Sequence, residues 1–235
     1  ESPNLQGLGK TKTNKMRLEG REGSKSVDDR RGRRGGLRGG TKTAGGIGLG
    51  GIIIVIIIML LGGDPSEFIG ASNGGASALA PRTAPAKSLE DDDPNFRIVS
   101  VTLKENEKIW GQIFPQLYGR EYKEPTLVVF EGEDRSACGF ASAATGPFYC
   151  PADQKVYIDL QFADLMRQRF RAPGDFALAY VVAHEVGHHI QNQLGYSQKV
   201  SQARRRSSET QANAMSVRLE LQADYLAGVW AHYAD

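Results

Sequence analysis

The chain has 235 residues with a net charge of +2, 40% hydrophobic residues and two cysteines. The hydrophobic content excludes a fibrous or fully disordered protein, and two cysteines exclude a Cys₄ zinc site. The charge is unevenly spread, because residues 1–45 carry 12 Lys and Arg against 5 acidic residues. This excess of positive charge lies in a Gly/Arg-rich tail and not on a folded face, so we expect no nucleic-acid partner.

Residues 1–43 are predicted to be a basic tail in the cytoplasm. Residues 1–15 precede the first methionine, Met16, and are either a cloning remnant or an upstream extension, so we leave them out of the fold.

An uncharged stretch of 20 residues, 44–63, follows the tail and contains the run IIIVIIIMLL. A helix of that length measures about 30 Å, which matches the hydrocarbon core of a bilayer. We therefore predict a transmembrane helix, in preference to a buried strand or to a signal peptide cleaved near residues 78–80. Cations precede the stretch and Asp64 and Glu67 follow it, so the positive-inside rule places the N-terminus in the cytoplasm and the rest of the chain outside.

Residues 64–95 contain several prolines and an acidic run, and are predicted to be a flexible linker. Residues 96–235 are enough for one folded domain. The expected elements of this domain are a helix over 101–118 that is interrupted near Pro115, strands over 125–130 and 155–160, and a helix over 160–171. These elements predict an α+β fold.

The next predicted helix begins after a cap at Asp175, ends near Gly195 and contains the sequence HEVGH. His184 and His188 are four residues apart, so both imidazoles lie on one side of the helix and can bind one metal ion. Glu185 lies between them in the pattern HExxH, where it is suited to take a proton from a water molecule. The alternative is a helix that carries histidines on its surface.

A catalytic zinc site needs a third protein ligand, and Glu220 is the preferred candidate. It belongs to a stripe of small and acidic residues on a predicted helix, which favours close packing against the HExxH helix. Asp224, one turn later, is expected to accept a hydrogen bond from a ligand imidazole. Glu209 is the rival ligand, in a polar stretch without an apolar flank.

Four blocks of sequence resemble the neutral zinc metallopeptidase family of single-pass bacterial membrane proteins: HEVGHHIQ, LELQADYLAGVWAH, GPFYCPADQKVYIDL and MRLEGREGSKSVDDRRG. The ELQAD block also resembles the third-ligand segment of membrane zinc proteases. The resemblance implies a zincin-like domain that binds Zn²⁺ through His184, His188 and Glu220, with Glu185 as the catalytic base. The chain departs from the family at Tyr225, where cysteine is common, and it stops at Asp235 inside a predicted helix where such proteins continue.

Cys138 and Cys150 lie 12 residues apart on the side predicted to be oxidising, so we expect a disulfide that contributes about 3 kcal/mol. Metal binding by this pair is the alternative.

The sequence therefore predicts a membrane-anchored zinc peptidase acting on a protein or peptide substrate. The alternative is a membrane-tethered binding module that holds zinc without turnover. Residues 141–149 are expected to offer a strand edge to an extended substrate. No single residue is predicted to stabilise the oxyanion, and the candidates are His189, Tyr225, His232 and Tyr233.

Overall fold

The protein is described by a computed structural model that covers residues 18, 20–32, 93–142, 145–170 and 175–234. The elements in chain order are β1 (Val27–Asp29), α3 (Pro94–Tyr118), β2 (Thr126–Phe130), β3 (Glu133–Ser136), β4 (Gly139–Ser142), β5 (Phe148–Cys150), β6 (Lys155–Asp159), α4 (Gln161–Phe170), α5 (Asp175–Gln193), α6 (Tyr196–Arg204) and α7 (Glu209–Tyr233). This mixture of helices and a small sheet confirms the predicted α+β class.

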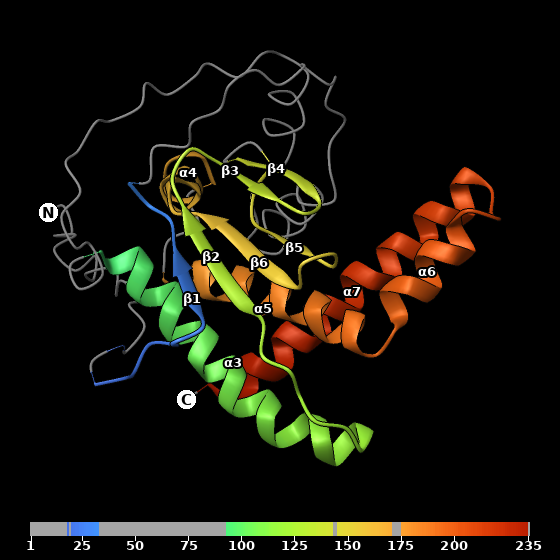
Figure 1. The fold of residues 1–235 in the computed structure, drawn as a ribbon, viewed down its shortest axis with the longest axis horizontal. Helices are drawn as coiled ribbons and strands as arrows, with labels where there is room; N and C mark the ends of the chain where they lie inside the picture. Colours follow the sequence, from blue (N-terminus) through green and yellow to red (C-terminus); the bar gives the residue numbers. More distant parts are fainter. Residues whose placement is uncertain (1–17, 19, 33–92, 143–144, 171–174, 235) are drawn as a thin grey trace, which may run out of the picture.

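Four strands form the central sheet in the order β1-β2-β6-β5. The strands β1, β2 and β6 are parallel, and β5 pairs with β6 in the antiparallel direction. β3 and β4 form a separate antiparallel hairpin. Figure 1 shows the long helices α3 and α5 beside the sheet, and α6 with the first half of α7 extending away from it as an arm.

Successive side chains of β2 and β6 point to opposite faces of the sheet, as strand pleating requires. One face joins the main core with α3, α5 and α7, and its residues are Leu127, Val129, Val156 and Ile158. The other face packs against Ala141 of the hairpin, and its residues are Val128, Phe130 and Tyr157. Because both faces are buried, β2 is apolar along its length and lacks the polar alternation of a half-exposed strand.

Helix α3 begins seven residues before the predicted start at residue 101. The Asp93 side chain caps it by accepting hydrogen bonds from the backbone N–H groups of Asn95 and Phe96. The predicted interruption near Pro115 is wrong. Pro115 lies in the last turn, where it removes a single helical hydrogen bond, and the backbone N–H of Gly119 donates to its carbonyl to close the helix.

The prediction of a separate tail over residues 1–43 is wrong for residues 20–32. Strand β1 pairs with β2, with Val27 opposite Leu127 and Asp29 opposite Val129. Several charges of this segment are paired within the fold: the Arg31 guanidinium is almost completely buried and contacts Asp29 and Asp93. An edge strand tolerates such polar residues when its charges find partners.

This pairing also bears on the predicted arrangement about a membrane. Neighbouring strands lie about 4.8 Å apart, whereas a hydrocarbon core is about 30 Å thick. Residues 20–32 and 93–234 therefore lie on the same side of any membrane. This pairing argues against the predicted placement of the N-terminal segment in the cytoplasm with the domain outside, and the location of the protein stays a prediction.

Within the part of the chain that the structure describes, every helix is too short or too polar to cross a membrane. The predicted span over residues 44–63 and nearly all of the linker over 64–95 lie outside the described residues, and these assignments stay predictions.

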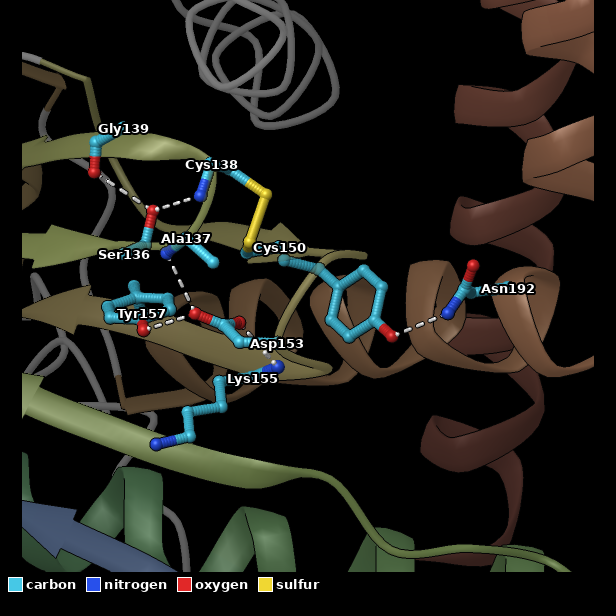
Figure 2. The surroundings of a disulfide bond; sticks show 10 residues. Ser136, Ala137, Cys138, Gly139, Cys150, Asp153, Lys155, Tyr157 and Asn192 are labelled. Carbon is cyan, nitrogen blue, oxygen red and sulfur yellow. Dashed lines mark hydrogen bonds between the residues drawn. A yellow bond between two sulfur atoms is a disulfide. The ribbon is translucent and has the colours of Figure 1, made fainter.

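The predicted disulfide between Cys138 and Cys150 is confirmed. It joins the turn of the β3–β4 hairpin to the edge strand β5, as Figure 2 shows. Next to it, the Asp153 carboxylate accepts hydrogen bonds from the Ala137 N–H and from the Tyr157 hydroxyl. The disulfide ties the hairpin turn to β5, and the Asp153 contacts tie the same turn to Tyr157 of β6.

Candidate metal centre

Two helices that are far apart in the sequence approach closely at Gly187 of α5 and Ala223 of α7. A Cβ atom added to Gly187 would lie 2.9 Å from the Ala223 carbonyl oxygen and 3.1 Å from the Ala223 Cα. Only glycine permits this approach. On α7, the small side chain of Ala223 leaves room for α5. This agrees with the stripe of small residues that was predicted on α7.

At this crossing, α5 contributes His184 and His188, and α7 contributes Glu220. The His184 Nε2 and His188 Nε2 atoms are 3.1 Å apart, and the Glu220 Oε2 atom lies 3.3 Å and 3.4 Å from them. Zinc bonds of about 2.0–2.1 Å place the ligand atoms of a tetrahedral site about 3.3–3.4 Å apart. The three lone-pair atoms therefore form a triangle of the size that a tetrahedral zinc ion needs.

The other ring nitrogen of each histidine is held by a hydrogen-bond acceptor. His184 Nδ1 lies 2.8 Å from the Asp224 Oδ1 atom, and His188 Nδ1 lies 2.9 Å from the Gln191 Oε1 atom. In a neutral imidazole, an acceptor at Nδ1 places the single proton there and leaves Nε2 unprotonated. Both Nε2 lone pairs then point toward Glu220. A histidine that binds a metal through Nε2 requires this tautomer, with its proton on Nδ1.

The electrostatics of the group favour a bound positive charge. Burial alone would lower the pKa of His184, but hydrogen bonds with Asp224 and Glu220 outweigh it and raise the pKa to about 9. Burial would raise the pKa of Glu220, but the two imidazole groups, whose Nε2 atoms lie 3.3 Å and 3.4 Å from Oε2, lower it to about 2. The carboxylate is therefore ionised, and its negative charge suits a proton or a metal cation placed between the three groups.

Glu185 is entirely buried beside this cluster, and neither of its carboxylate oxygens has a hydrogen-bond partner. Burial raises its pKa. An unsatisfied buried carboxylate is costly, so its retention here needs an explanation. A water molecule held next to the cluster would supply the missing partner.

The structure brings the predicted metal ligands together and leaves the rival ligand Glu209 apart from them. Among the described residues, His184, His188 and Glu220 are the one group of three or more His, Cys, Asp or Glu side chains that could hold a metal ion. Glu209 is exposed at the start of α7, three turns before Glu220, and lies outside this group.

The four candidates for an oxyanion stabiliser do not join the cluster. His189 is buried in the core, where it contacts the Tyr149 hydroxyl and the Lys123 carbonyl, and burial lowers its pKa to about 4. Tyr225, His232 and Tyr233 are exposed on α7. The structure favours none of the four for this role.

The sequence interpretation missed Gln191, whose side chain contacts His188 and the α7 backbone. The available signal was its position three residues after His188, which places both side chains on one face of α5. A glutamine at that spacing is common in helices and carries no metal-binding pattern of its own.

A His₂Glu set on two packed helices, with a free carboxylate next to the first histidine, is the ligand arrangement of one class of zinc-dependent peptidases. Comparison with known proteins agrees with that class. Residues 16–235 match the model of the family described as "Putative neutral zinc metallopeptidase", and the chain belongs to this family.

The chain is similar to several uncharacterised bacterial proteins. It is 42% identical over 218 residues to protein YpfJ of Escherichia coli strain K12. The aligned residues make up 92% of this chain and 75% of that protein. It is 41% identical over 127 residues to protein Rv2575 of Mycobacterium tuberculosis strain H37Rv. The aligned residues make up 54% of this chain and 40% of that protein. No solved structure matches the chain.

Proposed function

We propose that the protein is a zinc-dependent peptidase with His184, His188 and Glu220 as metal ligands and Glu185 as general base. The observation that carries this proposal is the triangle of three converging lone-pair atoms with an unpartnered, buried carboxylate next to it. When bound, zinc would supply Lewis acidity to the scissile carbonyl and make a water molecule more acidic.

Glu185 then takes a proton from the attacking water and passes it to the leaving amine. Its raised pKa suits this double role, because a carboxylate that holds a proton more tightly is the stronger base. The imidazoles keep their orientation during these transfers, since Asp224 and Gln191 hold the two Nδ1 atoms.

The substrate, in this proposal, is a protein or peptide that lies along β5. This strand is at the edge of the four-stranded sheet and pairs with β6 on one side. The backbone N–H of Tyr149 on β5 lowers the pKa of Glu185 against the effect of burial, so this N–H lies near the carboxylate although it makes no hydrogen bond of normal geometry with it. An extended peptide that added to the free edge of β5 would bring its backbone toward Glu185. Of the predicted edge over residues 141–149, this proposal uses residues 148 and 149, which belong to β5.

The test is cleavage of an unstructured protein by the full chain and by Glu185→Gln, with the zinc content of both measured. Both forms are expected to bind one zinc ion per chain, because Glu185 is not a ligand. Loss of the base is expected to lower the rate of cleavage by about 100-fold to 10,000-fold. If zinc binds but the unmodified chain cleaves nothing, the alternative of a zinc-holding binding module is correct. Absence of bound zinc would overturn both.

A further inference from the structure

The Gln191 side chain lies at the contact between α5 and α7 and is completely buried. It makes three hydrogen bonds. Its Oε1 atom is 2.9 Å from His188 Nδ1, and its Nε2 atom is 2.7 Å from the Leu219 carbonyl oxygen and 3.1 Å from the Gln222 Oε1 atom. A buried amide is costly unless its polar atoms are satisfied, and here both donor hydrogens and the acceptor have partners.

The orientation of this amide follows from its partners. The Leu219 carbonyl can only accept a hydrogen bond, so the Gln191 NH₂ group must face α7. The Oε1 atom then faces His188, and an amide oxygen can only accept. His188 must therefore carry a proton on Nδ1, and in the neutral ring it presents an unprotonated Nε2 to the cluster.

We propose that Gln191 is a positioning residue that sets the tautomer of His188 from the backbone of α7. The zinc-binding part of this proposal rests on the proposed function, but the tautomer part does not. Leu219 directly precedes Glu220, so one side chain orients a ligand on α5 and ties it to the turn of α7 that bears the third ligand. Asp224 acts in the same way on His184.

Gln191→Met tests this proposal because methionine has a similar length and volume but cannot form the three hydrogen bonds. The matched control is Gln193→Met, the same change two residues later on α5, where the side chain contacts Lys123. A second variant, Gln191→Glu, keeps an acceptor for His188 but loses the donor to the Leu219 carbonyl.

The first readout is the tautomer of His188 in the metal-free protein, from nitrogen chemical shifts of the imidazole under conditions in which the ring is neutral. We expect the Nδ1–H form in the unmodified chain and in Gln193→Met, and a mixture with the Nε2–H form in Gln191→Met. Gln191→Glu is expected to retain the Nδ1–H form. The same tautomer in the unmodified chain and in Gln191→Met would overturn the proposal.

The second readout is the zinc dissociation constant, measured by competition with a chelator. Loss of such an outer hydrogen bond weakens zinc binding by about 10-fold to 100-fold, which we expect for Gln191→Met but not for Gln193→Met. Equal affinity in both variants would contradict the role of Gln191 in the metal site. If no form binds zinc, the proposed function fails, whereas the tautomer measurement still decides the role of Gln191.

Discussion

Glu220 is the residue at which the choice of metal ligand is most easily tested. Its Oε2 atom contacts both imidazole nitrogens, and its carboxyl remains ionised at a low pKa of about 2. Glu220→Gln removes the negative charge and should weaken zinc binding by at least about 100-fold, measured by chelator competition. Glu209→Gln is the matched control on the same helix and should bind zinc like the unmodified chain. Equal loss in both variants would contradict the assignment.

The residues of the candidate site could be predicted from the sequence to different extents. The spacing of His184 and His188 is set by one helix, so their common direction follows from the sequence alone. The placement of Glu220 required two helices to meet, and the pattern of small residues on α7 indicated that they would. The role of Gln191 was out of reach, because the orientation of its amide depends on a carbonyl 28 residues later in the chain.

The close contact of α5 and α7 is the feature of the elements that positions the site. Gly187→Ala would put a Cβ atom 2.9 Å from the Ala223 carbonyl oxygen, and this backbone atom cannot move without moving α7. We expect a loss of about 1–3 kcal/mol in the free energy of unfolding from overpacking, and weaker zinc binding because Glu220 moves away from the histidines.

Gly228→Ala on α7 is the control for the change at Gly187. A Cβ atom at Gly228 would meet nothing within 4 Å, and alanine is the better helix former. This variant should be as stable as the unmodified chain or more stable, with unchanged zinc affinity, in chemical denaturation and chelator competition. Destabilisation by both substitutions to the same extent would show that the helix contact at Gly187 is not the cause.

Local patterns predicted the central elements better than those that depend on distant partners. The strand over 125–130 was recognisable from its apolar run and the strand over 155–160 from its alternating pattern, although the second is buried along most of its length and not only on one face. The start of α3 was hidden, because the capping residue Asp93 is the last of an acidic run that resembles a linker. Strand β1 has three residues, two of them Asp, and becomes a strand only through its pairing with β2.

At the scale of the whole molecule, the pairing of β1 with β2 constrains the arrangement of the chain about a membrane. The predicted span over residues 44–63 lies between β1 and α3, and about 20 residues are enough for a single crossing. A single crossing would separate two strands that hydrogen-bond to each other in this fold. The pairing therefore predicts that residues 20–32 and the domain lie on the same side of any membrane.

This constraint can be tested with single cysteines at Lys25, in the segment before β1, and at Tyr225, on α7, both of which are exposed. The two native cysteines are joined in a disulfide and do not compete for the label. A membrane-impermeant maleimide applied to intact cells should label both positions or neither, and lysis should make both reactive. Labelling of Tyr225→Cys alone would show that β1 and β2 are separated by a membrane in the cell. A single-pass anchor with a cytoplasmic N-terminus requires that separation. Strand β1 would then form only in the absence of a membrane between the two segments.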